Sequence, residues 1–168
     1  MCSSDLLMYQ KVKDADGGNV YYTFRTWGPG RTCKLQCDMS AMISPKMYDE
    51  FVLPYLRQQC RRLDNTLYHL DGVDAVKHLD SLLSIPELDA IQWTPGAGKA
   101  EAGDAQWYPI YRRILAAGKG AQALWIEPDS ARVLVEAVGA KGLMIVTSAK
   151  SEEEGREMVK EARGWRKG

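Results

Sequence analysis

Short apolar segments alternate with longer amphipathic segments along most of this chain, and this alternation constrains the fold more than any other feature. From Thr32 onward, five short apolar runs are bounded by Gly, Pro, Asp or Asn, which is typical of buried strands. These runs cover residues 33–38, 66–71, 90–93, 121–127 and 143–147. Because helical patterns lie between and after them, the sequence predicts parallel strands joined by right-handed helical crossovers.

The predicted helices carry start signals and apolar stripes. Ser44 is expected to be an N-cap with Pro45 at the first helical position, and Ser151 with Glu154 has the spacing of a capping box. Residues spaced at helical intervals predict the buried faces. They are Met47, Phe51, Tyr55 and Leu63; Val76, Leu79, Leu82 and Leu83; Trp107, Ile110, Tyr111, Ile114 and Leu115; Val133, Leu134, Ala137 and Val138; Met158, Val159 and Ala162.

The predicted fold class is α/β, with about five βα units that fit the C-terminal part of a TIM (β/α)₈ barrel. A doubly wound sheet also fits, but no glycine fingerprint follows the first strand, which disfavours its nucleotide-binding form. Five units are too few for an eight-stranded barrel of about 250 residues, so we expect a fragment. Before residue 32, the segment 20–24 predicts a strand or hairpin arm that ends in a turn at 27–30.

The first residues do not share these patterns. Residues 1–6 resemble a translated sequencing adapter, and we expect them, including Cys2, to be non-native. An ordinary frayed terminus is the alternative. The predicted organisation is therefore this non-native segment, an N-terminal arm or partial unit at 7–31, and the βα units at 32–168.

Composition narrows the function classes. The chain has 168 residues, with 45% hydrophobic and 26% charged residues, as in globular proteins. Lys+Arg and Asp+Glu both count 22, and this zero net charge argues against nucleic acid or an anionic membrane as the main partner. No apolar run approaches the roughly 20 residues of a membrane span. The four cysteines have no metal-finger spacing, so we expect reduced thiols in a cytoplasmic protein.

Polar residues at the predicted strand ends are the candidates for chemistry, because sites of parallel α/β folds lie there. His69 and Asp71 are two apart on one strand and face the same way. An imidazole beside a carboxylate suits a divalent metal or a general acid–base pair. The alternative is structural: Asp71 caps the next helix and His69 hydrogen-bonds the backbone.

Other strand-end residues have open roles. Asp38 is either a second catalytic carboxylate or a turn residue. Glu127 could be a metal ligand, a substrate contact or part of a helix start, and Trp93 and Arg25 are candidates for substrate binding. Cys33 and Cys37 form a weak metal signal, and buried thiols explain them better. His78 is predicted on the exposed side of its helix.

Three segments resemble the uroporphyrinogen decarboxylase superfamily. Residues 43–56, ISPKMYDEFVLPYL, are similar to its signature ISPEMFxEFVLPYL. Residues 68–72, YHLDG, and 88–98, LDAIQWTPGAG, resemble a subgroup described as uroporphyrinogen decarboxylase-like or trimethylamine corrinoid-associated. The resemblance covers roughly residues 20 to 163 and implies a (β/α)₈ barrel.

The resemblance implies two different activities. The methyltransferase branch binds zinc through a His-x-Cys pair at a strand end and a late Cys, and zinc makes the acceptor thiol nucleophilic. His69 matches that histidine, but Asp71 stands in place of the cysteine and no cysteine follows Cys60. The implied zinc site would contain His69 and Asp71 with Asp38 or Glu127.

The decarboxylase branch of porphyrin biosynthesis is a lyase that removes acetate carboxylates from a tetrapyrrole without a cofactor, using arginines and an aspartate. Arg25 and Arg31 are the nearby basic candidates. Since the His–Asp pair is closer to the methyltransferase pattern, we expect metal-dependent methyl transfer that involves a corrinoid or a methylated small molecule. The other alternative is a truncated, inactive fragment that self-associates through uncovered barrel edges.

Overall fold

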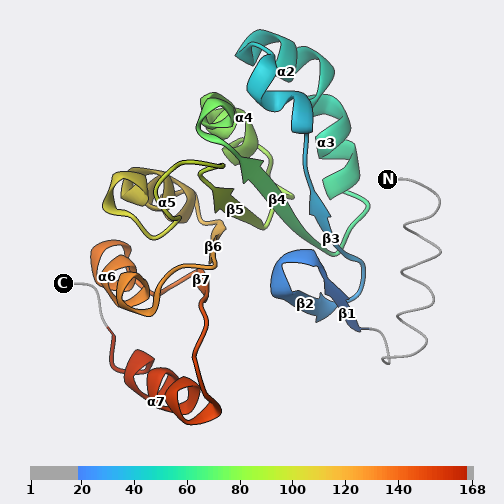
Figure 1. The fold of residues 1–168 in the computed structure, drawn as a ribbon. Helices are drawn as coiled ribbons and strands as arrows, with labels where there is room; N and C mark the ends of the chain where they lie inside the picture. The colour runs from blue at the N-terminus through green and yellow to red at the C-terminus, as the bar shows by residue number, and fades with distance from the viewer. Residues whose placement is uncertain (1–18, 166–168) are drawn as a thin grey trace. The chain divides into compact units, whose positions relative to one another are not determined.

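The computed structural model describes residues 19–165, leaving aside the side chains of 19–23 and 27, and it is an α/β structure. A parallel five-stranded sheet with the order β3-β4-β5-β6-β7 alternates with helices, and strands β1 and β2 form a separate antiparallel pair (Figure 1). The strands are β1 (Asn19–Tyr22), β2 (Thr26–Pro29), β3 (Thr32–Leu35), β4 (Asn65–Asp71), β5 (Ala90–Thr94), β6 (Gly120–Leu124) and β7 (Leu143–Val146). The expectations for residues 1–6 lie outside the described residues.

The helices follow the strands in the predicted alternation. The α-helices are α2 (Pro45–Phe51), α3 (Leu53–Cys60), α4 (Leu79–Leu83), α5 (Tyr108–Ala116), α6 (Pro128–Val138) and α7 (Glu152–Ala162). Short 3₁₀ turns are η1 (Thr23–Arg25), η2 (Asp38–Met42), η3 (Val73–His78) and η4 (Ala105–Trp107). In the described part of the chain, none of these helices has the length and hydrophobicity needed to cross a membrane.

The described chain divides into two compact units. One unit contains the residues up to His69 together with Asp74–Asp89, and the other contains Leu70–Val73 and the residues from Ala90 onward. In the first unit, β3 and β4 pair in parallel from Thr32 beside Asn65 to Leu35 beside Tyr68. In the second, β5, β6 and β7 pair in parallel.

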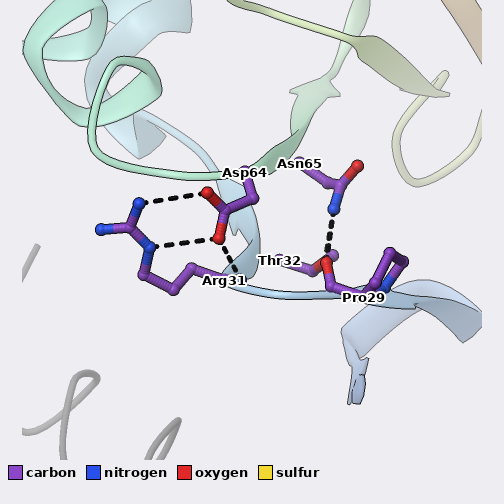
Figure 2. A network of polar contacts seen from close by, with 5 residues as sticks. All are labelled: Pro29, Arg31, Thr32, Asp64 and Asn65. Carbon is purple, nitrogen blue, oxygen red and sulfur yellow. Dashed lines mark hydrogen bonds and ion pairs between the residues drawn. The ribbon is translucent and has the colours of Figure 1, made fainter. Parts of the chain in front are cut away.

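Polar contacts tie the start of β3 to the start of β4 (Figure 2). Asp64 accepts hydrogen bonds from both the backbone N–H and the guanidinium of Arg31, at 2.8 to 3.2 Å. Asn65 donates from Nδ2 to the carbonyl of Pro29 at 2.7 Å. Gly30, between the two strands β2 and β3, has φ +71°, a left-handed conformation that glycine adopts without steric cost. This network fixes where β3 begins relative to β4.

The predicted helix after β3 is two helices, and its buried face differs from the prediction. Ser44 caps α2 by accepting from the N–H of Met47 at 3.2 Å, as expected, but the helix ends at Phe51 and α3 begins at Leu53. The predicted stripe is wrong, because Met47, Phe51 and Tyr55 are exposed. The side chains buried on these two helices are instead Tyr48, Leu53, Leu56 and Cys60.

In the second unit the apolar faces of α5 and α6 are mostly those predicted. Ile110, Tyr111, Ile114, Leu134 and Val138 are buried, whereas Val133 is 52% exposed. The capping box of α7 is confirmed, since the N–H of Glu154 donates to Ser151 Oγ at 3.2 Å. The predicted inward face of α7 is only partly correct, because Met158 and Ala162 are half-buried while Val159 is 60% exposed and no residue of α7 is fully buried.

Candidate functional site

His69 and Asp71 lie at the carboxyl end of β4. Along this strand Tyr68 and Leu70 are buried, His69 is half-buried and Asp71 is exposed. Tyr68 points to α2, because its hydroxyl and that of Tyr48 are hydrogen-bonded at 3.0 Å. Since side chains alternate along a strand, His69 and Asp71 share the side of β4 that faces away from α2.

Phe24 of η1 packs against His69. The centroids of the two rings are 4.7 Å apart and their planes are tilted by 36°. Phe24 and its neighbour Arg25 have φ values of +66° and +61°, in a region that non-glycine residues rarely occupy. Backbone strain of this kind is common at functional sites, where contacts with the surrounding structure maintain it. Arg25 is exposed.

A row of hydrogen-bonded polar side chains lies along β3, on the side of the sheet that also carries His69. The ammonium of Lys34 donates to Oε1 of Gln36, and Nε2 of Gln36 donates to Oδ1 of Asp38 at 2.7 Å. Lys34 Nζ also lies 5.4 Å from the centroid of the Phe24 ring. The prediction that Asp38 ends a strand is wrong. β3 ends at Leu35, and Asp38, three residues later, is the first residue of η2. Phe24 therefore contacts both His69 and Lys34.

Behind this face, buried hydroxyls and an imidazole join α2, β4 and η3. Burial raises the pKa of Tyr48, and it raises the pKa of Tyr68 to about 12. The ring of His78 stacks on Tyr48 at 4.2 Å, and its Nε2 is 2.8 Å from the carbonyl oxygen of Ser40. The prediction that His78 is exposed is wrong, because it is 1% exposed and desolvation lowers its pKa.

The second unit contains Trp93, the residue predicted to bind substrate at the end of β5. Trp93 is fully buried, and its ring meets Trp107 edge-on with the centroids 5.3 Å apart. Trp107 closes η4, immediately before α5. The indole of Trp93 thus faces η4 and contacts protein side chains.

Glu127, also in the second unit, stands at the N-cap position of α6, three residues after β6 ends. The predicted strand to residue 127 is therefore too long. The side chain of Glu127 is exposed and makes no capping hydrogen bond. Glu101 contacts this end of the helix instead, because it accepts from the backbone N–H of Glu127 at 2.9 Å and from Ser130 Oγ. The helix-start alternative is thus correct for the position of Glu127.

No group of three His, Cys, Asp or Glu side chains in the described residues is arranged to hold a metal ion. Cys33 and Cys60 are buried and Cys37 is half-buried, and none of the three forms a disulfide in this part of the chain. The side chains of metal-ligating type at the end of β4 are the imidazole of His69 and the carboxylate of Asp71.

Sequence reasoning missed Phe24, Lys34, Gln36 and Glu101. For two of them a signal exists, because residues 32–38 alternate strictly between polar residues and apolar or thiol residues. That period of two marks one buried and one open strand face. Phe24 and Glu101 act from turns and loops, where no periodicity exists.

Comparison with protein-family models, with curated proteins and with solved structures finds no match to this chain. The assignment of chemistry therefore depends on the geometry of these side chains.

Proposed function

We propose that the chain is an enzyme of the uroporphyrinogen decarboxylase superfamily type, with strands of a TIM (β/α)₈ barrel, and that it performs metal-dependent methyl transfer. The observation that carries this proposal is the position of His69 and Asp71, two residues apart on the side of β4 that faces away from α2. The carboxyl ends of parallel strands are where such folds place their reacting groups.

The donor set of His69 and Asp71 fits a divalent ion that accepts mixed nitrogen and oxygen ligands, such as zinc. Two protein ligands leave further coordination positions for water or substrate. A bound zinc ion would supply Lewis-acid chemistry. His69 is oriented by the Phe24 ring, and Asp71 is exposed where a substrate can reach it.

Other residues would bind and orient the substrate, a methylated small molecule or a corrinoid. Arg25 would attract an anionic group, and the carboxylate of Asp38, held by Gln36, would accept a proton. The thiols of Cys33, Cys37 and Cys60 fit a reducing compartment, and we propose the cytoplasm.

Metal content after zinc loading and desalting tests the proposal. The protein should retain about one equivalent of zinc, and His69→Ala or Asp71→Asn should lose most of it. Asp74→Asn, an exposed carboxylate change at η3, is the matched control and should retain zinc. Unchanged zinc content in His69→Ala would remove the basis for the metal site.

Cofactor-independent decarboxylation of uroporphyrinogen is the second candidate. It is favoured by the cationic side chain of Lys34 on the same face as His69, together with the carboxylate of Asp38. Turnover of uroporphyrinogen by metal-free protein separates the two activities. Product formation in the presence of a chelator would support decarboxylation, and chelator-sensitive methyl transfer would support the first proposal.

A further inference from the structure

The side of β3 that carries Lys34 is built differently from its buried side. Cys33 and Leu35 are buried, whereas Lys34 is half-buried and Gln36 is exposed. A lysine that packs along its stem usually directs its ammonium to water or to a carboxylate partner. The contacts of Lys34 show where its ammonium lies here.

Within the described residues, the ammonium of Lys34 contacts the amide oxygen of Gln36 and the face of the Phe24 ring, and it forms no ion pair. An ammonium has three N–H donors, so the Gln36 contact leaves two of them without an acceptor in this part of the chain. The nearby carboxylate of Asp38 is occupied at Oδ1 by the amide nitrogen of Gln36. Gln36 therefore separates the two charges.

Phe24 contacts a second nitrogen-bearing side chain, that of His69, as well as Lys34. Its ring contacts the imidazole of His69 at 4.7 Å and the Lys34 ammonium at 5.4 Å. A cation over an aromatic face is stabilised by the ring without using its N–H donors. Phe24 has φ +66°, a strained backbone conformation that such surrounding contacts maintain.

We propose that Lys34, oriented by Phe24 and Gln36, binds an oxyanion, a carboxylate or a phosphate group, beside His69. Charge-assisted hydrogen bonds from an ammonium are strong when the partner is an oxyanion, and the two remaining donors suit one. This inference deepens the proposed function. It rests on that function in one respect, namely that the oxyanion is part of the substrate. Binding itself requires neither metal nor turnover, so the two proposals fail separately.

The two histidines of the chain provide the test. Inorganic phosphate and succinate are titrated separately into metal-free protein while NMR follows the ring resonances of both imidazoles. His69 should shift saturably, and buried His78, which faces Ser40 and Tyr48, should not. Saturation by only one of the two anions identifies the chemical class of the ligand. Sodium chloride at equal ionic strength controls for screening.

Variants assign the effect to Lys34. Lys34→Met should weaken binding at least tenfold, and Lys34→Arg should retain it within a few-fold. Lys46→Met, at an exposed position on α2 of the same unit, should bind as the unchanged protein does. Equal affinity in Lys34→Met, or His69 shifts that chloride reproduces, would overturn the proposal. If Lys34→Met does not fold, Lys34→Gln and the chloride comparison decide in the same way.

Discussion

The imidazole of His78 is enclosed by the ring of Tyr48 and the carbonyl of Ser40, and this burial links its protonation to stability. Desolvation lowers its pKa in the folded protein, whereas an unfolded chain binds the proton near pH 6.5. Below that pH the unfolded state therefore takes up a proton that the folded state does not. The contribution of neutral His78 to stability is present above pH 6.5 and is lost as the pH falls.

We therefore expect the urea midpoint to decrease between pH 7.5 and 5.5, and the decrease to be smaller in His78→Gln. Carboxyl groups with lowered pKa, such as Asp64 beside Arg31, lose their contribution only at lower pH, below about 4. Equal slopes in His78→Gln and the unchanged protein would show that His78 is not the source.

Gly30 allows a second test at a single residue. A Cβ at this position would lie 2.6 Å from Oδ2 of Asp64, in a backbone with φ +71°. Gly30→Ala should therefore incur both backbone strain, about 1–2 kcal/mol, and disruption of the Arg31–Asp64 contacts. Gly98→Ala, with φ +73° and no atom within 4 Å of its Cβ, should incur the strain alone.

The free energy of unfolding in urea measures both variants. Gly30→Ala should lose more stability than Gly98→Ala, and Asp64→Ala in the Gly30→Ala background should reduce the difference. Identical losses in the two glycine variants would mean that the Asp64 side chain moves away without cost.

At the scale of elements, the N-terminus of α6 depends on a side chain from the loop between β5 and η4. The Glu101 carboxylate accepts from the N–H of Glu127 and from Ser130 Oγ, and its charge lies at the positive end of the helix. Glu101→Gln should cost about 1 kcal/mol, the order of one lost hydrogen bond to a charged group. Glu136→Gln on the same helix removes only an exposed pair with Arg132 and should cost less than half as much.

Amide hydrogen exchange locates this effect. The first turn of α6 should exchange faster in Glu101→Gln, while α5 should be unaffected. Unchanged exchange at Glu127 and residues 129–131 would contradict this role of Glu101, since Pro128 has no amide hydrogen.

Strand and helix positions could largely be predicted from periodicity, but the buried face of α2 and α3 could not. Two rows of residues four apart run along this segment, Met47, Phe51 and Tyr55 in one, and Tyr48, Val52, Leu56 and Cys60 in the other. Both rows are apolar, so spacing does not identify the one that packs on the sheet. The packing of Tyr48 on Tyr68 and His78 decides it, and that contact joins residues distant in sequence.

The same reasoning explains the outcome for the candidate site. His69 and Asp71 share one side of β4, which the two-residue period of a strand predicts. The burial of Trp93 against Trp107 could not be predicted, because the sequence pattern at a strand end does not tell whether an aromatic residue faces the core or a substrate site. Contacts made from turns, such as that of Phe24 with His69, depend on tertiary packing.

For the whole molecule, zero net charge and exposed apolar side chains act together. Lys+Arg and Asp+Glu both count 22, so little charge repulsion separates two copies near neutral pH. Met47, Phe51 and Tyr55 are 45%, 60% and 64% exposed along one side of α2 and α3. Such adjacent apolar groups favour association, because contact removes them from water.

We expect concentration-dependent self-association near pH 7 that weakens at pH 9, where the net charge is negative. Phe51→Glu should lower association several-fold by placing a charge within the apolar row. Val133→Glu, at a position on α6 that is 52% exposed against 60% for Phe51, is the matched control and should leave association unchanged. Sedimentation equilibrium measures each variant, and a monomer at every concentration, or equal effects of both substitutions, would show that this row does not drive association.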